Sequence, residues 1–276
     1  EEREYRDVQF DGQTADSLFE VPAGFERVTP IVTQQVAANT VERLAPDVYV
    51  LQSVAGANNN VLFVAFNDHV MVVDAPEPFP YVNASEQVMR KIKETVPGKP
   101  IKYAVLTHHH SDHSGGARGY VAEGVSIVTT RGNKSFVERM TAAPFAYAPD
   151  ALARKPRQPL FEFVEGKKRV FTDGQHTVEL HDIGPSPHAN EMVVVYLPKE
   201  KILFQADLLN PNQQGILPFA QDAAVHLAGK IQQLGLDVER IVGAHGRIVT
   251  AQEMRASVEK RKQMDSGGAT GAAHGN

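Results

Sequence analysis

The 276-residue sequence has no cysteine, no long apolar run and no excess of basic residues. Without cysteine, the chain can form no disulfides, thiolate nucleophiles or cysteine-rich metal sites. No apolar run approaches the ~20 residues that cross a bilayer, so a membrane partner is not expected. The formal net charge of −5 argues against nucleic acid as a partner, because proteins that bind it carry a basic excess. An apolar content of 42% is typical of a globular protein with a sizeable core.

The first residue is Glu1 rather than methionine. Removal of a signal peptide would explain this start, and so would trimming of a longer chain. We expect a periplasmic or secreted protein, with a cytoplasmic one as the alternative. The lack of cysteine does not decide between them, because a cysteine-free chain is stable in either redox environment.

One hexapeptide, residues 108–113, has an unusual composition. It follows the apolar run Ile101–Leu106, which predicts a strand buried on both faces. Its H-x-H-x-D-H pattern is formed by His108, His110, Asp112 and His113. Imidazole and carboxylate groups this dense are atypical of a core or a solvated surface, but both are common ligands of Zn²⁺ and similar ions. Because residues two apart on an extended chain point the same way, His108 and His110 can bind one ion while Asp112 and His113 face a second.

The pattern resembles the hallmark of the metallo-β-lactamase superfamily, in which it also follows a strand. That family has four further motifs, and matching residues occur here in the same order, at Asp74, His188, Asp207 and His245. Taken alone, each aspartate is compatible with a capped turn and each histidine with an ordinary loop position. All five motifs in order, spread over about residues 47–258, make the resemblance specific.

The resemblance implies a centre of two metal ions, expected to be Zn²⁺, with Fe or Mn as alternatives in one or both sites. It implies that His108, His110 and His188 hold the first ion, that Asp112, His113 and His245 hold the second, and that Asp207 bridges both. Asp112 would also orient a metal-bridging hydroxide and pass on its proton. Asp74 would accept a hydrogen bond from a ligand imidazole and fix its tautomer.

The function implied is that of a dinuclear zinc hydrolase that cleaves an ester, thioester, lactone or amide/lactam bond of a small molecule. The family's best-known lactamases carry Cys or a non-ligand where this chain has Asp207, so the ligand set resembles the glyoxalase-II, lactonase and phosphodiesterase branches. The net negative charge disfavours a nuclease or phosphodiesterase. β-Lactam hydrolysis stays open as a side or main activity. An iron oxidoreductase of the persulfide-dioxygenase type is the other alternative, and the complete ligand set favours hydrolysis over it.

The rest of the sequence predicts an N-terminal extension at 1–46, a folded domain at 47–265 and a disordered Gly/Ala-rich tail at 266–276. Apolar alternation or short apolar runs predict strands at Val48–Gln52, Val61–Phe66, His69–Val73, Ile101–Leu106, Ser126–Thr129, Val170–Phe171, Thr177–Leu180, Met192–Leu197, Lys201–Phe204 and Arg240–Val242. Apolar spacing and capping residues predict helices at Gln34–Leu44, Asn83–Val96, Gly115–Ala122, Asn133–Met140, Ala220–Leu234 and Thr250–Lys262. The pattern indicates an α/β fold, and the resemblance implies a four-layer αβ/βα sandwich.

The segment Ala142–Pro159 is rich in proline and carries Phe145 and Tyr147. It is either a connector or a lid, and we predict that Phe145 or Tyr147 contacts substrate. The rival interpretation is that these rings pack on the body of the protein or in a homodimer. Asn190 has two alternatives as well, a donor to a substrate oxyanion or a structural loop residue.

Overall fold

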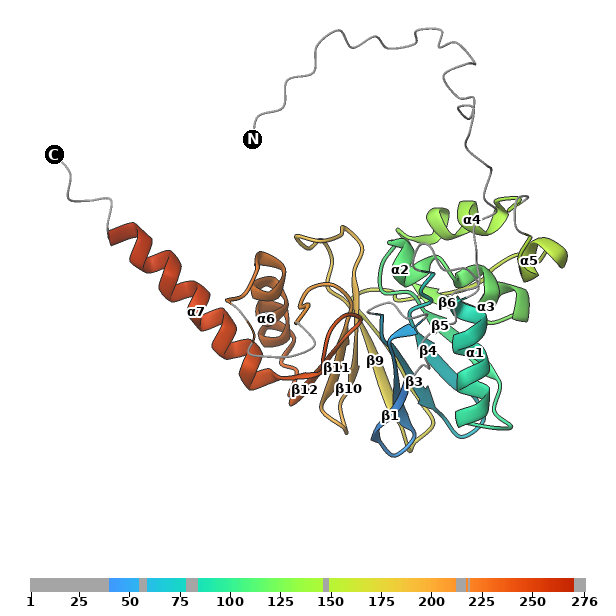
Figure 1. Ribbon diagram of the computed structural model, residues 1–276, viewed down its shortest axis with the longest axis horizontal. Helices are drawn as coiled ribbons and strands as arrows, with labels where there is room; N and C mark the ends of the chain where they lie inside the picture. The colour runs from blue at the N-terminus through green and yellow to red at the C-terminus, as the bar shows by residue number, and fades with distance from the viewer. Residues whose placement is uncertain are drawn as a thin grey trace, which may run out of the picture. The chain divides into compact units, whose positions relative to one another are not determined.

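Two β-sheets lie between two sets of helices in the computed structural model (Figure 1). The structure describes residues 40–54, 59–77, 84–145, 149–211, 217 and 219–270, with side chains up to 266, and all of them fall in the compact unit that begins at Gln35. The first sheet contains β1 (Thr40–Ala45), β2 (Val48–Gln52), β3 (Val61–Ala65), β4 (Val70–Val73), β5 (Ile101–Val105), β6 (Ser126–Thr129) and β7 (Leu160–Phe163), in that order. The second contains β8 (Lys168–Thr172), β9 (Thr177–Asp182), β10 (Val193–Leu197), β11 (Ile202–Gln205), β12 (Arg240–Gly243) and β13 (Val249–Thr250), again as neighbours in chain order.

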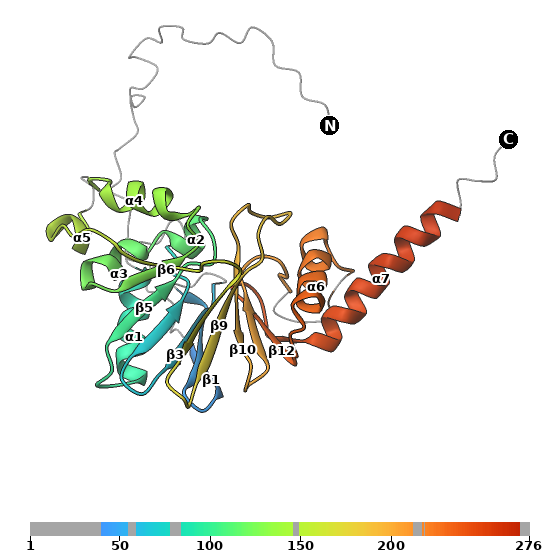
Figure 2. The same ribbon diagram turned by 180° about the vertical axis from the view of Figure 1, so that it is seen from behind.

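The helices divide between the two outer sides, as Figure 2 shows from behind. The first sheet is accompanied by α1 (Ala84–Thr95), α2 (Ser111–Ser114), α3 (Ala117–Glu123), α4 (Lys134–Ala142) and α5 (Ala151–Arg154). The second is accompanied by α6 (Asp222–Leu234) and α7 (Ala251–Thr270). Among the described residues, no helix combines the length and the apolar character that a membrane span requires.

Buried apolar side chains form three clusters, and these define the layers. One cluster contains residues of both sheets, such as Leu62 and Val73 with Val195 and Phe204, so it fills the space between the sheets. A second cluster joins the outer face of the first sheet to α1, α3, α4 and α5, and a third joins the second sheet to α6 and α7. The expected αβ/βα sandwich is therefore confirmed.

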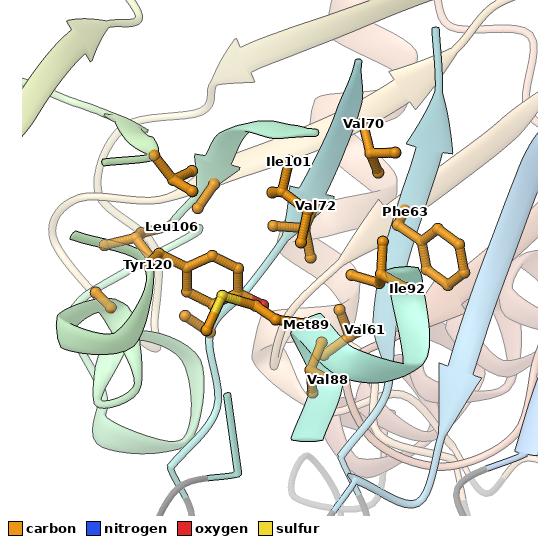
Figure 3. Close-up of a cluster of buried hydrophobic side chains, with 14 of the residues drawn as sticks. Val61, Phe63, Val70, Val72, Val88, Met89, Ile92, Ile101, Leu106 and Tyr120 are labelled. Atoms are coloured by element: carbon orange, nitrogen blue, oxygen red, sulfur yellow. The ribbon is translucent and has the colours of Figure 1, made fainter. Parts of the chain in front are cut away.

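Figure 3 shows how α1 closes the outer face of the first sheet. Val88, Met89 and Ile92 lie on one side of the helix, at the spacing expected of an amphipathic helix, and they face Phe63 and Val72. All five side chains are at most 6% exposed. Burying each contributes about 1.5–3 kcal/mol, so this contact accounts for much of the attachment of α1.

The central strands are apolar throughout because they are covered on both faces. β3, β4 and β10 are buried at every position, whereas the edge strand β8 alternates between exposed and partly buried residues. β5 differs from the expectation of a strand buried on both faces. Its Lys102 is exposed, and Tyr103 is only half-buried where it packs against Phe171.

Two parallel strand pairs, one in each sheet, end at one edge of the sandwich. β4 pairs with β5 in parallel, and β11 pairs with β12 in parallel. Residues just beyond these strands therefore share that edge, which is where α/β proteins place ligands. Asp74 follows β4, the hexapeptide follows β5, Asp207 follows β11 and His245 follows β12.

Two expectations for the ends of the chain need correction. The helix predicted at Gln34–Leu44 is wrong in its described part, because Thr40–Ala45 forms β1 and pairs with β2 from Thr40 onwards. The first sheet thus begins before residue 47, and β pairing outweighs the helical spacing of the segment. At the other end, the segment expected to be disordered from residue 266 is helical as far as Thr270. Just before this extension of α7, Arg261 pairs with Asp265 one turn later.

Arg118, a buried residue of α3, ties down the base of the proline-rich segment Ala142–Pro159. Its guanidinium donates to the carbonyl oxygens of Met140, Thr141 and Ala143 and, bidentately, to the carboxylate of Asp150 at 2.6 and 3.0 Å. Asp150 also caps α5 by accepting from the backbone N–H of Ala153. The start of this segment and its middle, at Asp150, are therefore anchored to the body of the fold.

Candidate metal centre

Seven side chains from four loops converge at the shared edge of the two sheets. Their ligand atoms form two overlapping sets, each with its atoms within 4.8 Å of one another. The first set contains His108, His110, His188 and Asp207, and the second contains Asp112, His113, Asp207 and His245. The structure thus brings together every residue that the resemblance assigned to the metals, in the same grouping, with Asp207 common to both sets.

The first set is built around two imidazoles and one carboxylate oxygen. His108 Nε2 lies 3.1 Å from His188 Nε2, and Asp207 Oδ2 lies 2.9 Å from His188 Nε2 and 3.4 Å from His108 Nε2. The ring of His110 faces that of His188, with centroids 4.6 Å apart. The hexapeptide of the first sheet and the β9–β10 loop of the second sheet are therefore in contact.

The second set uses both oxygens of the same aspartate. Asp207 Oδ2 lies 3.0 Å from His113 Nε2, and Asp207 Oδ1 lies 3.0 Å from His245 Nε2. Asp112 Oδ2 completes the set at 3.3 Å from His113 Nε2 and 3.1 Å from His245 Nε2. The carboxylate of Asp207 thus lies beside imidazoles of both sets, as a bridging ligand would.

These separations fit a metal better than they fit hydrogen bonds. His113 Nε2 and Asp207 Oδ1 are buried and make no hydrogen bond, although each has ring nitrogens or carboxylate oxygens nearby. Tetrahedral Zn²⁺ with bonds of about 2.0–2.1 Å would hold its ligand atoms about 3.3 Å apart. The observed spacings of 2.9–3.4 Å surround that value. The residues present therefore suit borderline divalent ions such as zinc.

Asp74 orients one ligand, as expected from the first motif. Its Oδ2 accepts from His113 Nδ1 at 2.9 Å, and its Oδ1 accepts from the backbone N–H of Thr107. A carboxylate only accepts, so Nδ1 carries the proton and the lone pair of Nε2 faces the second set. Asp74 is buried and has a φ of 68°, a left-handed conformation that Asp and Asn tolerate better than most residues.

We predict that Asp74→Asn weakens metal binding by about 10–100-fold, because the imidazole of His113 loses its charged acceptor. Asparagine also tolerates the positive φ, so the change isolates the hydrogen bond. The measurement is a zinc titration of the metal-free protein against a competing chelator. Asp68→Asn is the matched control, since Asp68 contacts His69 Nδ1 at 2.6 Å outside the metal centre. Equal affinities in wild type and Asp74→Asn would contradict the positioning role.

The surroundings of these ligands favour the protonation states that bind a metal ion. Burial, reinforced by neighbouring imidazoles such as His108, lowers the pKa of His110 and of His188. Both rings are thus neutral at neutral pH, the form that binds metal. Burial would raise the pKa of Asp207, but the adjacent imidazoles, led by His108 and His113, outweigh it and hold that pKa well below its usual range.

Two polar side chains shape the loops that carry His188 and Asp207. The Ser186 hydroxyl accepts from the backbone N–H groups of His188 and Ala189, which closes the turn before β10. Gln205, fully buried, accepts from the backbone N–H groups of Leu208 and Leu209 and so folds the chain around Asp207. Sequence reasoning overlooked Gln205, because its role depends on backbone groups that only the folded turn presents.

Solvent reaches the centre from one side. The side chains of His108 and His113 are fully buried, whereas those of His188, His245 and Asp112 are 25%, 20% and 34% exposed. A substrate would therefore approach over His188, His245 and Asp112. This is also the side on which a carboxylate that handles protons needs to lie.

The proposed substrate contacts lie outside the two ligand sets. Asn190 is exposed two residues after His188, and its oxyanion role stays a prediction. Phe145 is exposed, and its ring stacks on the guanidinium of Arg118 at 4.9 Å, as the rival interpretation of packing on the body predicts. Tyr147 lies outside the described residues. His109, inside the hexapeptide, is exposed and packs edge-on against Phe136.

Comparison with known proteins agrees with the fold and the motifs. Residues 55–245 match the family model of the metallo-beta-lactamase superfamily. A curated relative, metallo-beta-lactamase type 2 of Elizabethkingia meningoseptica, is 22% identical over 224 residues, which cover 77% of this chain and 80% of the relative. A metallo-beta-lactamase from Pontibacter korlensis has a similar fold, with a TM-score of 0.59, 21% identity and coverage of 80% of this chain and 97% of that one.

A mono-zinc form of the metallo-beta-lactamase FIM-1 from Pseudomonas aeruginosa has the same fold as well, with a TM-score of 0.55 and 19% identity. The similarity covers 84% of this chain and 98% of FIM-1. These solved structures support the architecture, and the family model spans most of the described domain, including the hexapeptide and the three later ligand positions. The chain belongs to the metallo-beta-lactamase superfamily and is a metal-dependent hydrolase.

Proposed function

We propose that this protein is a dinuclear zinc hydrolase that cleaves an ester, thioester, lactone or amide/lactam bond of a small molecule. The observation that carries the proposal is the position of Asp207, whose two carboxylate oxygens face the imidazoles of both donor sets. A single-metal centre would need only one of these sets. Two bound divalent ions would supply a nucleophilic oxygen at neutral pH and charge stabilisation for the transition state.

Asp112 is the residue best placed to handle protons. The adjacent imidazoles of His113, and then of His245, hold the pKa of its carboxyl well below its usual range, so it is ionised at neutral pH. About a third of its side chain is exposed, and Oδ2 lies among the ligand nitrogens. It can therefore accept a hydrogen bond from the attacking oxygen and pass a proton towards the leaving group.

Two observations bear on the choice of substrate. The shared donor is Asp207 rather than a cysteine, and in this the ligand set resembles that of the lactonase and glyoxalase-II branches. The curated relative is named a metallo-beta-lactamase, so β-lactams belong among the substrates to test. The iron oxidoreductase alternative uses one ion and part of the donors, which leaves the complete second set without a role.

Metal analysis and an activity panel test the proposal. We expect two zinc ions per chain, a colourless protein, and hydrolysis of at least one member of a panel of lactones, thioesters, esters and β-lactams, with phosphodiesters inactive. Addition of a strong chelator removes the activity and zinc restores it. One iron per chain, with oxygen consumption in the presence of a thiol substrate, would overturn the hydrolase assignment.

The aromatic residues of the proline-rich segment give a second test. We predict that Phe145→Ala combined with Tyr147→Ala raises KM several-fold and leaves metal content unchanged, because a lid that positions an apolar substrate acts on binding. Steady-state kinetics and metal analysis measure both quantities. If Phe145 serves only to cover Arg118, the double variant instead lowers the melting temperature, and KM barely changes.

A further inference from the structure

Two adjacent asparagines bind the loops that carry Asp112 and His245. Asn59 and Asn60 lie immediately before β3. Asn59 Nδ2 donates to the backbone carbonyl of Asp112 at 3.1 Å, on the loop that follows β5 of the first sheet. Asn60 reaches the turn that follows β12 of the second sheet.

Asn60 makes three hydrogen bonds to that turn. Its Nδ2 donates to the carbonyls of Gly243 and Gly246, each at 2.9 Å, and its own backbone N–H donates to the carbonyl of Ala244 at 2.7 Å. These three acceptors surround His245 in sequence. The side chain of Asn60 is 5% exposed, so water cannot replace it as the donor without rearrangement.

The turn around His245 is closely packed. Gly246 has a φ of 78°, and a Cβ at that position would lie 1.9 Å from the carbonyl oxygen of Pro211. A Cβ at Gly243 would lie 2.7 Å from the carbonyl oxygen of His245. The backbone on both sides of His245 is thus tightly folded, and the amide of Asn60 is one of the groups that hold it.

The two bonded loops share one property. Asp112 and His245 belong to the second donor set and not to the first, while Asp207 belongs to both. In the described part of the chain, the side-chain hydrogen bonds of Asn59 and Asn60 reach Asp112 and the turn around His245. The hexapeptide that Asn59 reaches also carries His108 and His110 of the first set, whereas the turn that Asn60 reaches carries no first-set ligand. His188, for example, is positioned by Ser186 instead.

We propose that Asn59 and Asn60 are positioning residues for the second metal ion, and that they control its affinity separately from that of the first. The inference rests on the proposed dinuclear function. Removing the amide of Asn60 releases the carbonyls on both sides of His245, and removing that of Asn59 releases Asp112. Loss of such outer contacts typically weakens metal binding by 10–100-fold, and here only the second ion is expected to be affected.

The test is a titration of the metal-free protein with Co²⁺ and with Zn²⁺ that resolves two binding sites. Calorimetry measures the binding of both ions, and the visible spectrum measures that of Co²⁺ as well. We expect wild type to bind two ions. We expect Asn60→Ala to bind the first with unchanged affinity and the second about 10–100-fold more weakly. Asn59→Ala removes a single bond to Asp112 and is the milder variant, which remains informative if Asn60→Ala folds poorly. Asn67→Ala is the matched control, because Asn67 bonds Asp173 in a turn that carries no ligand.

The outcomes separate the two proposals. Wild type that binds one ion only would overturn both the dinuclear function and the role of the asparagines. Two ions in wild type, with both weakened equally in Asn60→Ala and Asn59→Ala, would mean a general structural role and overturn the selective one. Unchanged second-site affinity in both folded variants would overturn it as well. Asn60→Asp, which keeps the shape but presents oxygens to the carbonyls, is expected to be at least as impaired as Asn60→Ala.

Discussion

Asp207→Ala is expected to lose both metal ions and to reduce kcat/KM by roughly 10³-fold or more, equivalent to about 4 kcal/mol of transition-state stabilisation. The physical reason is that its oxygens lie 2.9–3.0 Å from ligand nitrogens of both sets. Without this carboxylate, two cations would lie close together with less negative charge between them. Metal content after dialysis and the rate with the best substrate of the panel measure the effect.

Asp237→Ala is the control, because Asp237 is 74% exposed and pairs with Lys201 at the surface. It should keep full metal content and activity. An Asp207→Ala protein that retains two ions and near-normal turnover would show that the dinuclear model is wrong. Retention of one ion with partial activity would show that the first set can act without its shared ligand.

Arg118→Met is expected to lower the free energy of unfolding by about 3–5 kcal/mol, the cost of leaving a buried charge without its partner. The change removes the guanidinium from Asp150 and from the carbonyls of Met140, Thr141 and Ala143. Urea denaturation of the metal-loaded protein measures it. Arg131→Met is the control, since Arg131 pairs with Glu165 at the exposed surface, where such pairs contribute less than about 1 kcal/mol.

The ion pair between Arg118 and Asp150 predicts that the free energy of unfolding depends on pH. Burial raises the pKa of Asp150, but hydrogen bonds from Arg118 and from the N–H of Ala153 outweigh it and lower that pKa overall. A lowered folded-state pKa means that the contribution is complete above the unfolded-state value of about 3.9 and is lost as the pH falls through the folded-state value. The stability difference between wild type and Asp150→Asn should therefore be full at pH 7 and should close in acid. A difference that persists unchanged at pH 3 would contradict this.

The motifs predicted the fold and the grouping of the seven donors because four of the five motifs follow a strand that is apolar enough to be recognised in the sequence. Val70–Val73 and Ile202–Gln205 are continuously buried strands, and Asp74 and Asp207 follow them closely. The family's order of motifs then supplied which loops meet. Spacing alone would not have placed His188 beside His108, since the two lie 80 residues apart in sequence.

Features that depend on distant backbone groups were missed. Nothing in the sequence near Asn59 and Asn60 shows that their amides reach the carbonyls of Asp112 and Gly243. Arg118 has the same character, with acceptors scattered over several loops. The helix expected up to Leu44 was wrong because strand pairing with Val48–Gln52 outweighs local propensity.

The order of the strands has a consequence for how the protein matures. Residues 40–163 build the first sheet and residues 168–250 build the second, so neither half borrows a strand from the other. The hexapeptide ligands come from the first half, and His188, Asp207 and His245 come from the second. Neither half can assemble a full donor set before the two have docked. A complete donor set therefore requires that both halves have folded and docked, and a newly made chain that ends before His188 has only the donors of the hexapeptide.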